Sequence, residues 1–121
     1  MLRNILLVED DEFLRAIMAE AVSMLGHVVT DRPSADQALI ALEGLSPFSM
    51  VITDVRMPGR LDGLELAQTI WSRWPELPVI IMSANTVLPA DFLPPNATFL
   101  TKPVHLDTLQ DAIAALIPQE M

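Results

Sequence analysis

The sequence predicts a doubly wound α/β fold, in which helices cover both faces of a five-stranded parallel sheet. Short apolar segments that suit strands alternate along the chain with segments whose apolar residues recur at helical spacing. Three of the strand segments, residues 5–8, 50–53 and 79–82, are almost continuously apolar rather than alternating. That pattern is typical of parallel strands buried on both faces. Together the two observations favour a sheet built from strand–helix–strand units.

Each element has its own sequence signal. Gly26 follows the first helical segment and suits a helix end, and Pro75 and Pro118 end two later helices. Ser34, with Gln37 three residues on, has the spacing of a helix cap, and Asp62 can cap the next helix. The expected strands are 5–8, 27–30, 50–53, 79–82 and 98–101, and the expected helices are 13–25, 34–42, 62–74 and 107–117.

One segment departs from this alternation. Between the fourth and fifth expected strands, residues 84–98 contain the prolines Pro89, Pro94 and Pro95. Because proline lacks a backbone N–H and clashes with the preceding turn of a helix, the segment has room for about one helical turn. We therefore expect the helix at this place, the fourth in such a fold, to be stunted or absent.

Composition narrows the class of protein. The 121 residues fit one domain, residues 1–121, and 51% apolar against 19% charged residues indicates a globular chain. A net charge of −9 argues against direct binding of nucleic acid, which usually needs a basic patch. The apolar runs are far shorter than the roughly 20 residues that span a membrane. The N-terminus does not resemble a signal peptide and there is no cysteine, so we expect a cytoplasmic protein.

Residues capable of chemistry follow the strand segments. Glu9 and Asp10 come after the first strand, Asp54 after the third, Ser83 after the fourth, and Lys102, the only lysine, after the fifth. In open parallel sheets, functional sites lie beyond the carboxyl ends of the strands. Carboxylates, a hydroxyl and an ammonium at one edge suit the transfer of a phosphoryl group onto a carboxylate with help from a divalent metal ion.

The same motifs resemble those of receiver domains from two-component response regulators. The resemblance covers the whole chain and depends on four pieces in order, the acidic group 9–11, the segment 54–59, the pair 83–84 and the pair 102–103. Each piece alone is common, since Asp54 by itself suits a turn and Lys102 a solvated surface. The resemblance implies a flavodoxin-like sheet with strand order 2-1-3-4-5.

The resemblance also implies a role for each site residue. Asp54 would be the phosphoacceptor, and it would hold Mg²⁺ together with Asp10, the neighbouring Glu9 and the backbone carbonyl of Arg56. Ser83 and Lys102 would contact the phosphoryl oxygens. Phe99 would occupy the position of the aromatic switch residue, although such a residue more often belongs to the core.

A receiver domain would take its phosphoryl group from a histidine kinase or a histidine phosphotransfer protein. It would catalyse only its own phosphorylation and dephosphorylation, and would signal to an unknown protein target through the loop after the fourth strand. Two alternatives remain open. One is a pseudo-receiver, a binding module that is never phosphorylated. The other is a phosphohydrolase with an aspartate nucleophile, which 121 residues make less favourable because such enzymes usually add a cap domain.

Overall fold

The computed structural model describes residues 3–44, 47–57, 59–84, 88 and 91–117. Strands and helices alternate over most of this length, as the sequence predicts. In chain order the elements are β1 (Asn4–Val8), α1 (Glu12–Met24), β2 (Val28–Arg32), α2 (Ala35–Leu42), β3 (Met50–Asp54), α3 (Gly63–Arg73), β4 (Val79–Ser83), β5 (Ala97–Thr101) and α4 (Leu106–Leu116). The second strand begins one residue later than expected and extends to Arg32.

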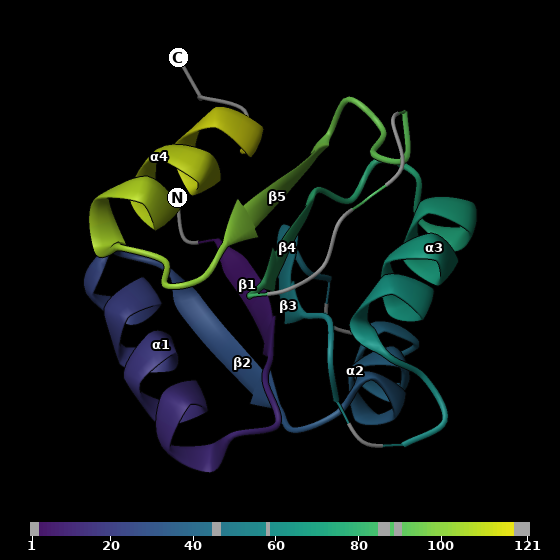
Figure 1. Ribbon diagram of the computed structural model, residues 1–121, viewed down its shortest axis with the longest axis horizontal. Helices are drawn as coiled ribbons and strands as arrows, with labels where there is room; N and C mark the ends of the chain where they lie inside the picture. Colours follow the sequence, from purple (N-terminus) through teal and green to yellow (C-terminus); the bar gives the residue numbers. More distant parts are fainter. Residues whose placement is uncertain (1–2, 45–46, 58, 85–87, 89–90, 118–121) are drawn as a thin grey trace.

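All five strands are parallel, and they lie in the order β2-β1-β3-β4-β5 (Figure 1). The predicted doubly wound topology is confirmed. Val8, Thr53, Ile81 and Phe99 form one row across the sheet. The residues that follow this row therefore lie together at the carboxyl edge of the sheet.

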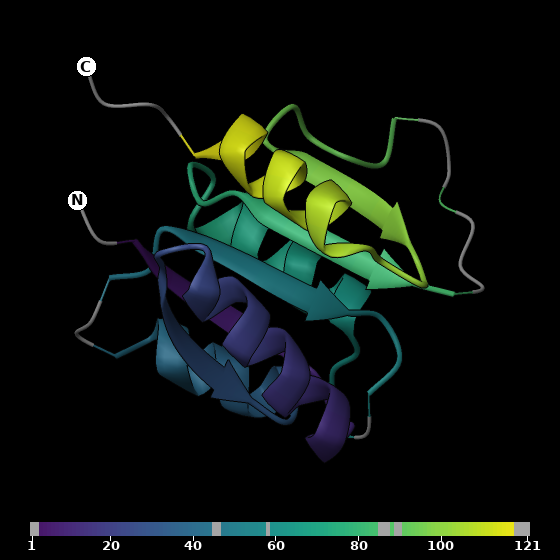
Figure 2. The same ribbon diagram turned by 90° about the vertical axis from the view of Figure 1, so that its left-hand side faces the viewer.

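Helices cover both faces of the sheet. The α1 and α4 helices lie on one face, and α2 and α3 lie on the other (Figures 1 and 2). The inner strands β3 and β4 are buried throughout, so alternate side chains enter two separate apolar cores. The core under α1 and α4 includes Ile5, Leu7, Ile52, Ile80 and Met82, and the core under α2 and α3 includes Leu6, Val8, Val51, Leu66 and Ile81.

Side-chain caps fix the first turns of three helices. Asp11 accepts a hydrogen bond from the backbone N–H of Leu14 at the start of α1, and Ser34 does the same for α2. Asp62 and Glu65 form a reciprocal capping box at the start of α3. Such caps typically stabilise a helix by about 1 kcal/mol each. They set where each helix begins relative to the strand before it.

The segment between β4 and β5 contains no helix among its described residues, 84, 88 and 91–96. This agrees with the expected stunted or absent helix, although residues 85–87 and 89–90 lie outside the described part of the chain. Phe92 instead packs its ring on Trp71 of α3, with centroids 5.6 Å apart and planes at 71°. Within the described residues, no helix is long and apolar enough to cross a membrane.

Candidate functional site

The carboxyl edge of the sheet brings the predicted site residues together. The ammonium group of Lys102, which follows β5, lies 2.8 Å from Oδ2 of Asp54 and 3.3 Å from Oε1 of Glu9. It thus joins residues that are 48 and 93 positions away in the sequence. The backbone N–H of Lys102 donates to the carbonyl of Ser83 at 3.0 Å, which fixes the end of β4 beside it. Four strand ends therefore meet around one lysine.

The two carboxylates that contact Lys102 are buried, and this affects the pKa values in the site. Glu9 is 1% exposed and Asp54 9% exposed. Burial raises the pKa of Glu9, and Asp10 and Asp54 raise it further, while the N–H of Asp11 and the charge of Lys102 oppose them. Burial lowers the pKa of Lys102, but its hydrogen bonds and charge pairing with Asp54 and Glu9 outweigh burial and raise the pKa. The site therefore holds an excess of negative charge around a firmly protonated lysine.

The backbone around Asp54 is held on several sides. Its Oδ1 accepts a hydrogen bond from the N–H of Val55 at 2.7 Å, and its main-chain carbonyl accepts from the hydroxyl of Thr53 at 2.8 Å. Gly63, the first residue of α3, donates its N–H to the carbonyl of Val55 at 2.7 Å. A Cβ atom at Gly63 would collide with the main-chain carbonyl of Asp54. Glycine is therefore required where α3 approaches the end of β3.

Three carboxylates form a cluster suited to a metal ion. Glu9, Asp10 and Asp54 each offer an oxygen, and these oxygens lie within 4.8 Å of one another. Carboxylate oxygens are the protein ligands that Mg²⁺ prefers, and Mg²⁺ usually takes only one or two of them and keeps several waters. The exposure of Asp10 leaves one side of the cluster open to water. The donor set therefore fits a hard divalent cation.

The remaining predicted residues have different surroundings. Ser83 is the last residue of β4 and is 4% exposed. The Arg56 side chain is exposed two residues beyond Asp54. Phe99 is half-buried on β5, where it packs against the core under α2 and α3. Their parts in phosphoryl binding, metal binding and switching stay predictions.

Sequence reasoning missed two contacts of the acidic turn. The guanidinium of Arg15, on α1, donates from Nη1 to the main-chain oxygen of Glu9 at 2.9 Å. The N–H of Asp11 donates to Oε2 of Glu9 at 3.1 Å. Arg15 lies one turn after the cap of α1, but an arginine at that place in a helix is ordinary. No sequence signal distinguishes it from a solvated surface charge.

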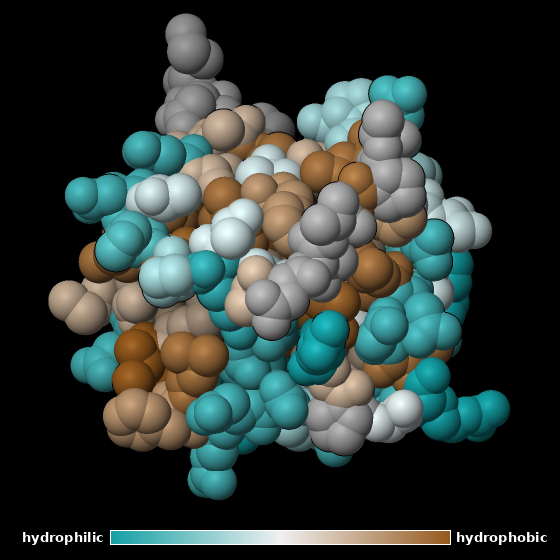
Figure 3. All heavy atoms as spheres, viewed as in Figure 1, coloured by the Kyte–Doolittle hydropathy of each residue, from teal (hydrophilic) through white to brown (hydrophobic). Residues whose placement is uncertain are grey.

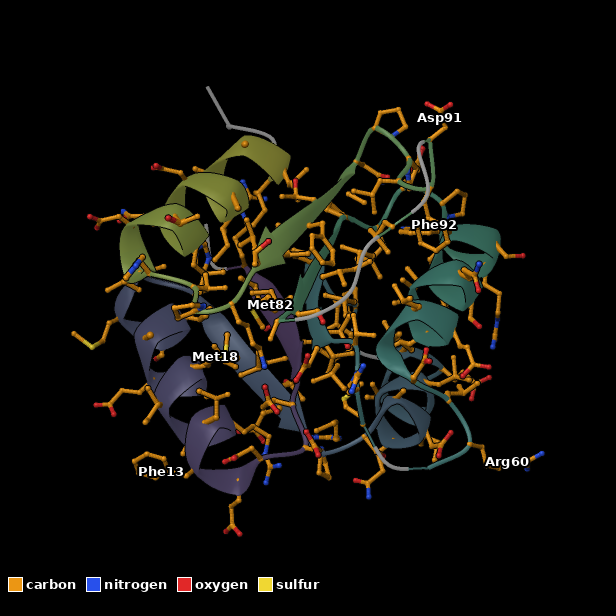
Figure 4. All side chains as sticks on the ribbon, viewed as in Figure 1. Phe13, Met18, Arg60, Met82, Asp91 and Phe92 are labelled. Carbon is orange, nitrogen blue, oxygen red and sulfur yellow. The ribbon has the colours of Figure 1, made fainter. Side chains whose placement is uncertain are left out.

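An apolar groove of about 560 Å³ lies beside the charged centre, between α1 and α4. Lys102 lies at its margin, and its walls include Ile17, Met18, Met82 and Leu106. Figure 4 shows Met18 on α1 and Met82 on β4, and Figure 3 shows hydrophobic residues gathered over α1 on the side that faces the viewer. Phe13, which precedes the groove residue Leu14 on α1, is 77% exposed. The site therefore adjoins an uncovered apolar surface.

This fold, with acids after β1 and β3 and a lysine after β5, defines a receiver domain. The family model for the response regulator receiver domain matches residues 5–114. The chain therefore belongs to the receiver domain family of two-component response regulators, and the predicted resemblance is confirmed.

Two relatives show the range of proteins that carry this domain. The chain is 37% identical over 117 residues to the response regulator protein FleR of Pseudomonas aeruginosa, in a match that covers 94% of this chain and 24% of FleR. It is 32% identical over 119 residues to the response regulator receiver protein CpdR of Brucella abortus, covering 96% of this chain and 98% of CpdR. The chain thus spans about a quarter of FleR and nearly all of CpdR.

A solved structure has the same fold. The response regulator protein TrrA of Thermotoga maritima, crystallised in complex with Mg²⁺ and BeF, superposes with a TM-score of 0.83 at 25% identity. The match covers 95% of this chain and 99% of TrrA.

Proposed function

We propose that this receiver domain accepts a phosphoryl group on Asp54 from the phosphohistidine of a histidine kinase or a histidine phosphotransfer protein. The observation that carries the proposal is the position of Asp54. Its carboxylate contacts the ammonium of Lys102 at 2.8 Å and also belongs to the acidic cluster with Glu9 and Asp10. A nucleophile between a fixed cation and a set of metal ligands is the arrangement that phosphoryl transfer to a carboxylate requires.

The chain's own residues account for most of the chemistry. An oxygen of the ionised Asp54 attacks phosphorus, a new O–P bond forms, and the N–P bond of the donor breaks with its electron pair returning to the imidazole nitrogen. The transition state spreads negative charge over the equatorial oxygens. Lys102, whose ammonium lies 2.8 Å from Oδ2 of Asp54, would neutralise part of that charge, and the hydroxyl of Ser83 would donate to another oxygen. The product is an acyl phosphate on Asp54.

A magnesium ion would complete the site. Asp10, Asp54 and the backbone carbonyl of Arg56 would hold it, with Glu9 beside them. When bound, the ion neutralises the repulsion between the attacking carboxylate and the phosphoryl group. The carboxylate oxygens of Glu9, Asp10 and Asp54, within 4.8 Å of one another, suit this role, and TrrA, which was crystallised with Mg²⁺ and BeF, has the same fold.

The acyl phosphate would act as a switch. It brings roughly two negative charges into a confined place. Ser83 lies at the start of the β4–β5 segment, so a contact between its hydroxyl and the phosphoryl group would move that segment, and Phe99 would change its packing with it. The output is then a contact with a protein target. We propose that the domain, residues 1–121, acts in the cytoplasm and catalyses only its own phosphorylation and dephosphorylation.

The groove between α1 and α4 offers a place for the donor protein. A phosphohistidine must reach Asp54 from outside, so the protein that bears it has to rest on surface near Lys102. Ile17 of α1 and Leu106 of α4, 47% and 45% exposed, line the groove, and Phe13, one helical turn before Ile17, is 77% exposed. Exposed apolar patches of this kind mark protein contacts.

Intact-mass analysis tests the proposal directly. The wild type, incubated with acetyl phosphate and Mg²⁺, should gain one phosphoryl group, and Asp54→Asn should gain none. Omitting Mg²⁺ or adding a chelator should suppress the gain. An unchanged wild-type mass would favour the alternative of a binding module that carries no phosphate. Steady hydrolysis of a small phosphomonoester would favour the phosphohydrolase instead.

A further inference from the structure

Arg15 places a positive charge beside a proposed site for a positive ion. Arg15 is half-buried, and its guanidinium contacts the acidic turn itself, with Nη1 2.9 Å from the main-chain oxygen of Glu9. Charge alone would make this arginine a disadvantage for metal binding, because like charges repel. We infer that Arg15 is a positioning residue, which holds the turn that carries Glu9 and Asp10 in the shape that binds Mg²⁺.

The chain leaves the sheet at Glu9. Its N–H donates to the carbonyl of Arg32 at 3.1 Å, which continues the pairing of β1 with β2 by one residue. Its C=O belongs to the planar peptide that joins Glu9 to Asp10, so the direction of this one carbonyl constrains how both carboxylates leave the chain. A guanidinium gives a charge-assisted hydrogen bond, which is stronger and more directional than a neutral one. Arg15 therefore fixes two of the three members of the acidic cluster through one peptide plane.

The side chain of Glu9 is held by two further hydrogen bonds. Oε2 accepts from the N–H of Asp11 at 3.1 Å, and Oε1 accepts from Lys102 at 3.3 Å. The acidic turn is therefore held by Arg15 from α1, by the backbone hydrogen bond to Arg32 of β2, and by Lys102. Loss of the arginine would leave the Glu9–Asp10 peptide free to rotate while the carboxylates kept their charge. Mg²⁺ affinity would then fall because the ligands are misplaced, even though a positive charge that repels the ion has been removed.

The positioning role and simple charge repulsion predict opposite effects of removing Arg15 on Mg²⁺ affinity, so a titration can distinguish them. The test rests on the proposed function of the site. Mg²⁺ affinity is measured by calorimetric titration for the wild type, Arg15→Gln, Arg15→Lys and Arg60→Gln. Arg60 is the charge-matched control, since it is exposed and its hydrogen bond to Asp36 comes from its backbone N–H. Both Gln variants lose one positive charge, so Coulomb attraction alone predicts tighter binding in both.

The positioning role predicts the opposite for Arg15. We expect Arg15→Gln to bind Mg²⁺ about 10-fold more weakly or worse, the usual loss when a group that orients metal ligands is removed. Arg15→Lys keeps the positive charge but lacks the planar set of N–H donors of the guanidinium, so it should recover only part of the Mg²⁺ affinity. Arg60→Gln should bind at least as tightly as the wild type. Equal or tighter binding by Arg15→Gln would overturn the inference.

A second readout needs no metal. In nitrogen-15 correlated spectra of the metal-free protein, Arg15→Gln should shift the amide signals of Asp10 and Asp11, and Arg60→Gln should leave them unchanged. Arg15→Lys should bring them part of the way back. Unshifted Asp10 and Asp11 signals in Arg15→Gln would contradict the inference. A wild type that binds no Mg²⁺ would count against the proposed function, while this spectral comparison would still decide the role of Arg15.

Discussion

Glu9 is the residue at which function and stability oppose each other most directly. Its carboxylate is 1% exposed, and burial is the main cause that raises its pKa above 4.5. The folded state therefore favours the protonated acid. That contribution to stability is fully present below pH 4.5 and is lost as the pH rises through the folded-state pKa. Near neutral pH the ionised Glu9 therefore lowers the free energy of unfolding of the metal-free protein.

Glu9→Gln should therefore raise the thermal stability of the metal-free protein at neutral pH, because it keeps the shape of the side chain without its charge. The gain should shrink toward zero as the pH falls below about 4.5, where the wild type is itself protonated. Thermal unfolding followed by circular dichroism between pH 4 and pH 8 measures this. Glu43→Gln is the control, because Glu43 pairs with Arg73 on the surface and such pairs contribute about 1 kcal/mol or less. A gain that does not depend on pH would contradict the explanation.

Gly63 matters because of close approach rather than backbone freedom. In Gly63→Ala the new Cβ would collide with the main-chain carbonyl of Asp54, so α3 or the end of β3 has to shift. We expect a loss of roughly 1–3 kcal/mol in the free energy of unfolding, as for other overpacked sites. Phosphorylation by acetyl phosphate should also slow, since the nucleophile moves. Urea unfolding and the time course of intact mass measure the two effects.

Gly26→Ala is the matched comparison. Gly26 has φ of +97° and no atom within 4 Å of an added Cβ, so the substitution strains only its own backbone. It should cost about 1 kcal/mol of stability and leave the rate of phosphorylation unchanged. If both variants slowed phosphorylation equally, general destabilisation rather than displacement of Asp54 would be the cause.

At the scale of elements, α1 shows how far periodicity can predict structure. Helical spacing assigns Phe13, Leu14, Ile17, Met18 and Val22 to one apolar side. The structure places Val22 in the core, leaves Ile17 exposed on the wall of the groove, and leaves Phe13 exposed one helical turn before it. Spacing identifies the residues that share a side of a helix. It does not say how much of that side the rest of the protein covers, because coverage depends on the position of α4.

This exposed surface makes a specific prediction about the donor. Phe13→Ser and Ile17→Ser should reduce phosphoryl transfer from a phosphohistidine protein by roughly 10-fold, since burying one large apolar side chain is worth about 1.5–3 kcal/mol. Phosphorylation by acetyl phosphate, which needs no docking surface, should be unaffected. Rates with the two donors are compared by intact mass.

Ile40→Ser is the control for that comparison. Ile40 is 68% exposed on α2, on the opposite face of the sheet, so its loss removes similar apolar surface far from the groove. It should leave both rates unchanged. If phosphoryl transfer from the phosphohistidine protein slowed equally in Phe13→Ser and Ile40→Ser, that protein would not dock on α1.

The β4–β5 segment shows another limit of sequence reasoning. The prolines predict that it lacks a full helix, but they do not predict what holds it. The structure shows two ties to the end of α3, the ring contact of Phe92 with Trp71 and a hydrogen bond from Asn96 to the carbonyl of Pro75 at 3.0 Å. Such contacts between an irregular segment and a distant helix leave no periodic signal in the sequence.

For the whole molecule, the parallel sheet explains why the site could be predicted in outline. Glu9, Asp54, Ser83 and Lys102 each end a strand of one sheet or directly follow it, so topology brings them to the same edge. The pairing of Lys102 with both acids depends on side-chain direction and could not be predicted. The same holds for the hydrogen bond of Arg15 to the acidic turn. The sequence pattern predicts the fold and the edge of the sheet at which the site residues lie, whereas their side-chain contacts depend on how the side chains pack.

The clustering of acids in a chain of net charge −9 leads to a last prediction, that Mg²⁺ stabilises the folded protein through this one site. A ligand that binds only the folded state adds about 1.4 kcal/mol for each tenfold rise in concentration above its dissociation constant. The unfolding midpoint of the wild type should therefore keep rising with Mg²⁺, whereas Asp10→Ala, which loses an exposed member of the cluster, should not respond. Sodium chloride at matched ionic strength controls for screening of the general negative charge. If Asp10→Ala rose in parallel with the wild type, Mg²⁺ would be acting on the acidic surface as a whole rather than at the carboxyl edge of the sheet.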